Sequence, residues 1–113
     1  ALPLKLKGAF HSPFMNAASE AFRVELENAK INKGNITLYS DLTSMPYTDD
    51  VAELLSKQIC SPVLWEKIVR NMIADGFDTF IEIGPGRTLT NMIKKISADV
   101  KAQTVEEYLS EVE

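Results

Sequence analysis

The stretch that decides the fold is Thr79-Phe80-Ile81-Glu82-Ile83-Gly84-Pro85-Gly86. Its first five residues are almost continuously apolar, which is typical of a strand buried on both faces in a parallel sheet. The Gly-Pro-Gly segment predicts a tight turn into a helix, because apolar residues then recur at helical spacing at Leu89, Met92, Ile93 and Ile96. A strand, a sharp turn and a helix in succession favour an α/β layer fold.

Working outward from this stretch, the sequence predicts the same alternation on both sides. We expect strands near residues 4–7, 36–40 and 79–83, and an extended segment at 100–103. Helices are expected over 13 to about 30, from Thr48 to about Cys60, from Ser61-Pro62 to Gly76, through Leu89 to Ile96 after the Gly-Pro-Gly turn, and from Val105 to about Val112. Ser12 and Thr48 are the expected caps of two of these helices, and Thr104 with Glu107 predicts a capping box for the last one.

Two features of the central stretch invite a chemical interpretation. Glu82 interrupts an apolar strand, and a buried carboxylate needs hydrogen bonds, so we interpret it as a latch to neighbouring loops or helix amides. The turn after it could hold an anion at a helix amino end, but it has neither the glycine spacing nor the Gly-Lys-Ser/Thr ending of nucleotide-binding loops. The acidic pair Asp49-Asp50 is explained by the start of a helix, without catalysis.

Composition narrows the class of protein. The chain has 113 residues, 45% hydrophobic and 25% charged, with net charge -4, so one small globular domain is expected and binding to nucleic acid or to an anionic membrane is not. No apolar run approaches the ~20 residues that span a bilayer, and the first residues lack the order of a secretory signal, so we expect a soluble cytoplasmic protein. A single cysteine and a single histidine exclude a disulfide framework and a Cys/His metal cluster.

The only histidine, His11, lies in Gly8-Ala9-Phe10-His11-Ser12-Pro13, where an alternating segment meets a helix start. It could be a structural imidazole beside a cap, or a general base that takes a proton from a nucleophile. Cys60 is an unfavoured nucleophile, since a small buried residue at a helix end is the commoner explanation, and no Gly-x-Ser-x-Gly elbow occurs. His11, Ser40-Asp41 and Gly84-Pro85-Gly86 all follow predicted strands and could converge on one site.

Three stretches carry a resemblance to a known family. Residues 8–13, Gln58-Ile59-Cys60-Ser61-Pro62-Val63-Leu64-Trp65, and Phe80 to Thr90 resemble successive motifs of malonyl-CoA:acyl carrier protein transacylases and of polyketide synthase acyltransferase domains. The resemblance implies a cofactor-independent enzyme that transfers malonyl from malonyl-CoA to acyl carrier protein through an acyl-serine. It implies that this chain is the carboxyl-terminal part of a hydrolase-like, three-layer, parallel-sheet acyltransferase domain. Residues 1–8 would be the end of the small ferredoxin-like subdomain or its return strand, and residues 9–113 would belong to the large subdomain.

The same resemblance implies roles for particular residues. His11 matches the catalytic base, Gln58 the residue whose backbone carbonyl orients that base, and Phe10 a bulky neighbour associated with preferring malonyl over branched acyl groups. The serine elbow, the oxyanion-hole glutamine and the malonyl-binding arginine are absent from this chain, so an amino-terminal part should supply them. A base without its nucleophile cannot transfer an acyl group, so the chain alone is expected to be inactive.

Two alternatives stay open at this point: a segment of a polyketide synthase acyltransferase domain, with the same chemistry, and a non-catalytic interaction module built from the half-fold. In every case the strands at 36–40 and 79–83 would have uncovered edges. We therefore expect exposed apolar surface or self-association.

Overall fold

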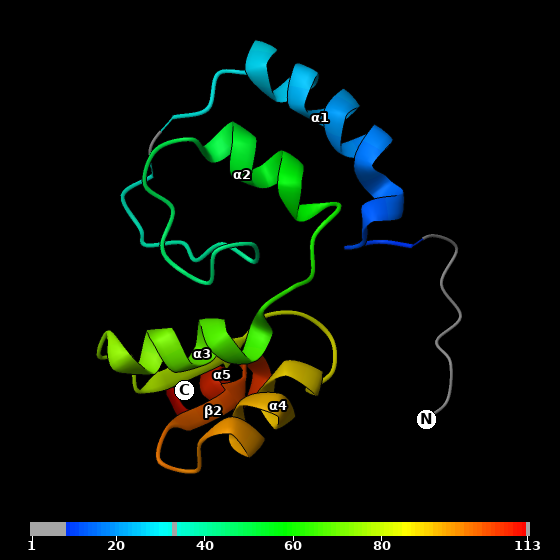
Figure 1. Ribbon diagram of the computed structural model, residues 1–113. Helices are drawn as coiled ribbons and strands as arrows, with labels where there is room; N and C mark the ends of the chain where they lie inside the picture. The colour runs from blue at the N-terminus through cyan, green and yellow to red at the C-terminus, as the bar shows by residue number, and fades with distance from the viewer. Residues whose placement is uncertain (1–8, 33, 113) are drawn as a thin grey trace. The chain divides into compact units, whose positions relative to one another are not determined.

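The computed structural model describes residues 9–32 and 34–112, and the chain divides into two compact units, one extending to Ile68 and the other starting at Val69 (Figure 1). The strand expected at 4–7 and the subdomain boundary expected at residue 8 lie outside the described residues. The elements in chain order are the 3-10 turn η1 (Pro13–Met15), α1 (Asn16–Asn28), α2 (Val51–Gln58), α3 (Trp65–Ala74), β1 (Thr79–Glu82), α4 (Thr88–Ile96), β2 (Lys101–Thr104) and α5 (Val105–Val112).

The second unit confirms the predicted α/β unit. β1 and β2 pair in parallel, with Thr79 opposite Lys101 and Glu82 opposite Thr104, and α4 is the crossover between them. Both α4 and α5 pack against the two strands. The apolar side chains buried in this unit include Val69, Ile93 and Ala102. The parallel connection that the central stretch predicted is therefore present.

Burial of β1 on both faces was wrong for the described residues. The strand alternates between exposed and half-buried positions, and Ile83, just beyond it, is 84% exposed. Among the described residues α4, α5 and β2 are the elements that pack against β1, and they leave its alternate side chains exposed. The expected exposed apolar surface is therefore present in this unit, while self-association stays a prediction.

In the first unit α1 packs against α2 (Figure 1). Ser19 of α1 is buried, and its hydroxyl donates to the main-chain carbonyl of Ser56 in α2 at 2.5 Å. The apolar stripe expected along the first helix is otherwise largely uncovered among the described residues, with Phe14 88% exposed. A small polar residue of each helix, Ser19 and Ser56, is therefore buried at this contact.

The strand predicted at 36–40 was wrong. In its place the structure has an irregular segment with a single antiparallel bridge between Tyr39 and Pro46. Ile36 and Leu38 are 83% and 64% exposed, respectively. A β-branched and aromatic run becomes a strand only where another strand pairs with it, and the described residues supply one bridging position.

The predicted helices are present, but their amino ends and their caps were predicted less accurately than their carboxyl ends. The Ser12 hydroxyl donates to the Ala9 carbonyl at 2.5 Å and caps no helix, and the residue that precedes α2 is Asp50, not Thr48. α3 begins at Trp65, later than Ser61-Pro62 suggested. The capping box at the start of α5 is confirmed, since the Glu107 carboxylate accepts from the Thr104 amide at 3.2 Å and the Thr104 hydroxyl accepts from the Glu107 amide at 3.3 Å.

Candidate functional site

The candidate site is built on the carboxyl end of α2. The last carbonyls of a helix have no partner within it, and three carbonyls among residues 56–59 here accept hydrogen bonds from the segment around His11 and from α1. The Ser56 carbonyl accepts from the Ser19 hydroxyl at 2.5 Å, the Gln58 carbonyl lies 2.9 Å from Nδ1 of His11, and the Ile59 carbonyl accepts from the main-chain amide of His11 at 2.8 Å. The segment that begins α1 therefore satisfies the end of α2.

His11 reaches two of those carbonyls because of its backbone conformation. Its φ is 62°, in the left-handed region that non-glycine residues adopt at a cost of about 1–2 kcal/mol. This conformation accompanies hydrogen bonds from both the main-chain N–H and the ring to the end of α2. Backbone strain of this kind persists where surrounding contacts over-determine it, and it is common at functional sites.

The ring of His11 has two distinct nitrogens. With Nδ1 donating to the Gln58 carbonyl, the neutral ring has its lone pair at Nε2. A base in that tautomer accepts a proton at Nε2 and remains bound at Nδ1. His11 is exposed, so a partner can reach it.

The structure also links His11 to a segment that was singled out from the sequence. The side-chain oxygen of Gln58 accepts from the Ser40 hydroxyl at 3.1 Å and from the Tyr47 hydroxyl. Gln58 therefore contacts both Ser40 and His11, which is in line with the expected convergence of these two segments. Tyr47 was missed, and its only sequence signal was an aromatic ring with a polar tip at the end of a polar loop.

Phe10 precedes His11 and is 57% exposed. An apolar ring that far out of the core is available to contact another group. Its role in acyl selection stays a prediction. Cys60 is half-buried, and its thiol donates to the Lys57 carbonyl at 3.4 Å, so it acts as part of the turn after α2.

The latch role of Glu82 is confirmed within the second unit. Its carboxylate accepts from the Thr90 amide and hydroxyl, both at 2.8 Å, and from the Leu89 amide at 3.3 Å. These donors, the Thr90 amide first, hold the pKa of Glu82 below its usual range. The carboxylate of the chain itself therefore occupies the amino end of α4, where the turn Gly84-Pro85-Gly86 had suggested an anion site.

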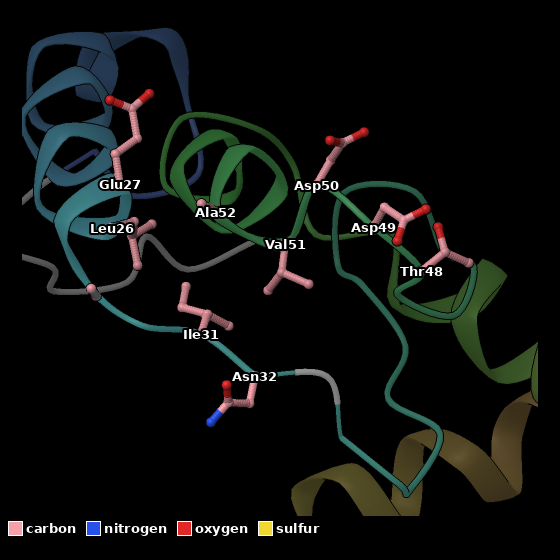
Figure 2. Close-up of a pocket in the computed structure, with 10 residues that line it drawn as sticks. Leu26, Glu27, Ile31, Asn32, Thr48, Asp49, Asp50, Val51 and Ala52 are labelled. Atoms are coloured by element: carbon pink, nitrogen blue, oxygen red, sulfur yellow. The ribbon is translucent and has the colours of Figure 1, made fainter.

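A separate hollow of about 410 Å³ lies between the end of α1 and the start of α2. Figure 2 shows the side chains around it, with acidic groups from α1 and from the segment just before α2: Leu26, Glu27, Ile31, Asn32, Thr48, Asp49, Asp50, Val51 and Ala52. None of the three residues predicted for the active site lines it. No helix in the described part of the chain is long and apolar enough to cross a membrane.

Comparisons with known proteins give a consistent result. The chain is 36% identical over 107 residues to the malonyl CoA-acyl carrier protein transacylase of Bacillus subtilis, with 93% of this chain and 34% of that protein covered. It is 35% identical over 102 residues to the polyketide biosynthesis transacylase PksC of the same organism, covering 89% of this chain and 35% of PksC. The crystal structure of the transacylase from Clostridium perfringens superimposes with a TM-score of 0.90 at 34% identity, over 98% of this chain and 38% of that one. No protein-family model matches the chain.

The parallel strands, the crossover helix and these superpositions define the class: the chain has the fold of the carboxyl-terminal portion of an acyltransferase domain. More narrowly, it is a homologue of the malonyl-CoA:acyl carrier protein transacylases and corresponds to their carboxyl-terminal part. It spans about one third of the length of the curated relatives that it matches.

Proposed function

We propose that this chain is the histidine-bearing part of an enzyme that transfers a malonyl group from malonyl-CoA to the phosphopantetheine thiol of acyl carrier protein. The observation that carries the proposal is the 2.9 Å hydrogen bond between Nδ1 of His11 and the Gln58 carbonyl. It gives a lone histidine the fixed tautomer that a general base requires. The proposal is also supported by the names of the homologues, which are malonyl CoA-acyl carrier protein transacylases.

The proposed reaction has two acyl transfers. In the first, Nε2 of His11 takes the proton of a serine hydroxyl, the serine oxygen bonds to the thioester carbonyl of malonyl-CoA, and the carbon–sulfur bond breaks. The departing CoA sulfur receives the proton from His11. In the second transfer, the carrier-protein thiol gives its proton to His11 and attacks the acyl-serine, whose oxygen leaves and is reprotonated.

The end of α2 contributes to each proton transfer. When His11 accepts a proton its ring becomes positively charged, and the carboxyl end of a helix carries partial negative charge that stabilises a cation beside it. The Gln58 carbonyl keeps the ring oriented in both charge states, because Nδ1 is a donor in each. Phe10, beside the base, is proposed to limit the space for branched acyl groups.

The serine, the oxyanion-hole donors and the carboxylate-binding arginine are proposed to come from the part of the protein that precedes this chain. The chain alone is then inactive. The test is acyl-enzyme formation from radiolabelled malonyl-CoA with the whole protein, or with this chain plus its separately produced amino-terminal part. Label should bind covalently and pass to acyl carrier protein, and His11→Ala should lower the rate by a factor of about 10³ or more.

A polyketide pathway is the second candidate. The chain is 35% identical to PksC and 36% identical to the other Bacillus subtilis transacylase, so sequence identity does not separate the two pathways. The chemistry is unchanged and only the carrier protein differs. Faster transfer to a polyketide carrier protein than to the fatty acid carrier protein of the same cell would favour it. A properly folded whole protein that takes up no label would instead favour the non-catalytic interaction module.

A further inference from the structure

The side chain of Gln58 has its own anchoring site, distinct from the contact that its main chain makes. Its amide oxygen accepts hydrogen bonds from two hydroxyls, Ser40 at 3.1 Å and Tyr47. An amide oxygen has two lone pairs, so both of its acceptor positions are filled. Residue 58 is therefore held at two places, by its side chain on one side and by His11 on the other.

The two hydroxyls belong to a loop that is itself fixed. Ser40 is fully buried, and its oxygen accepts from the Leu42 amide at 3.1 Å, which leaves its proton for Gln58. The Tyr47 amide donates to the Leu38 carbonyl at 2.8 Å, and the Ser40 amide donates to the Met45 carbonyl at 3.0 Å. These bonds close the loop on itself, so the two hydroxyls form a preorganised cradle.

The position of Gln58 gives this cradle its importance. Gln58 is the last residue of α2, where the carbonyls are no longer directed by the hydrogen-bond ladder of the helix. The Gln58 carbonyl accepts one long main-chain bond, from the Ser61 amide at 3.5 Å, so its direction depends largely on what else holds the residue. We propose that Ser40 and Tyr47 are positioning residues: by holding the Gln58 side chain they aim its carbonyl at Nδ1 of His11 and so keep the proton on Nδ1 and the lone pair on Nε2.

This inference rests on the proposed function for its catalytic meaning, but the tautomer of His11 can be measured on the 113-residue chain by itself. His11 is the only histidine, so its ring nitrogens give one unambiguous set of signals in long-range ¹H–¹⁵N spectra of the neutral ring. The variants are Tyr47→Phe, Ser40→Ala and Gln58→Leu, the last of which keeps the carbonyl and loses the tether. Tyr108→Phe and Ser110→Ala, both in α5, are matched controls that remove the same groups elsewhere.

In the unchanged chain the neutral ring should carry its proton on Nδ1. Each of the three variants should lower the ratio of the Nδ1–H to the Nε2–H form by about threefold to fivefold, the effect of weakening one hydrogen bond, and the controls should leave it unchanged. A role confined to stabilising the loop would change the unfolding temperature without changing this ratio in the folded protein.

An unchanged ratio in variants whose backbone spectra remain native would overturn the inference, and so would an Nε2–H ring in the unchanged chain. If Ser40→Ala fails to fold because the residue is fully buried, Tyr47→Phe decides, since it removes a single oxygen from a half-buried ring. In the whole protein the same variants should lower kcat with little change in KM for malonyl-CoA. Altered tautomers together with no acyl transfer would overturn the proposed function while supporting the positioning role.

Discussion

The left-handed conformation of His11 makes a quantitative prediction about stability. The ring bond to Gln58 is lost in His11→Ala and in His11→Gly alike, while the main-chain bond from residue 11 to the Ile59 carbonyl can persist in both. The two variants therefore differ chiefly in how they tolerate a φ of 62°.

The magnitude follows from two opposing terms. Alanine in the left-handed region costs about 1–2 kcal/mol, which glycine avoids. Glycine loses about 0.4–1 kcal/mol more backbone entropy on folding. His11→Gly should therefore be more stable than His11→Ala by roughly 1 kcal/mol, although glycine is normally the less stable choice.

Urea unfolding followed by far-ultraviolet circular dichroism measures this difference. Ala21→Gly in the exposed middle of α1 is the control, and it should lower the free energy of unfolding by about 1 kcal/mol, opposite in sign to the comparison at residue 11. If His11→Ala equals or exceeds His11→Gly in stability, the left-handed conformation is not a source of strain and the reasoning fails.

Glu82, Phe10 and the exposed pair Ile36 and Ile83 each allow a further test. The pKa of Glu82 is lowered by the Thr90 and Leu89 donors, so its stabilising contribution is complete above the usual value of 4.5 and is lost as pH falls through the lowered value. Glu82→Gln should therefore flatten the acid side of the curve of unfolding free energy against pH, and an unchanged curve would contradict this assignment. Phe10→Ala in the whole protein should raise the rate with branched acyl-CoA relative to malonyl-CoA by about tenfold in competition assays. Unchanged selectivity would mean that Phe10 does not contact the acyl group. Ile36→Lys together with Ile83→Lys should lower self-association in sedimentation velocity, because these side chains are 83% and 84% exposed, and unchanged association would mean that other surfaces drive it.

Local features of this chain were predictable from the sequence. The α5 capping box, the strand–turn–helix around Glu82 and the carboxyl ends of α1 and α2 depend on residues a few positions apart. The hydrogen bonds of the Glu82 carboxylate were also predictable. An acidic residue in an apolar strand needs donors, and the amino end of the following helix offers them.

Features that depend on distant partners were not predictable. The run at 36–40 has the composition of a strand, but strand formation requires a neighbour that the described residues do not provide beyond the bridge at Tyr39. The contact between His11 and Gln58 joins residues 47 positions apart, and it was expected only through the family resemblance. The Tyr47 contact had only a weak sequence signal, the aromatic ring with a polar tip, because its partner is specified by the closure of a loop onto the end of α2.

The group proposed to orient His11 is a peptide oxygen, that of Gln58, and this has a consequence for how the protein would tolerate mutation. Every codon change at that position leaves the oxygen in place, so no single substitution can delete it as a substitution can delete an aspartate from a hydrolase triad. Damage must instead come indirectly, through the loop or the helix that sets the direction of the oxygen. If the proposed function holds, substitutions that misdirect this oxygen should be spread over the segments around residues 40, 47 and 58 and should lower activity by graded amounts.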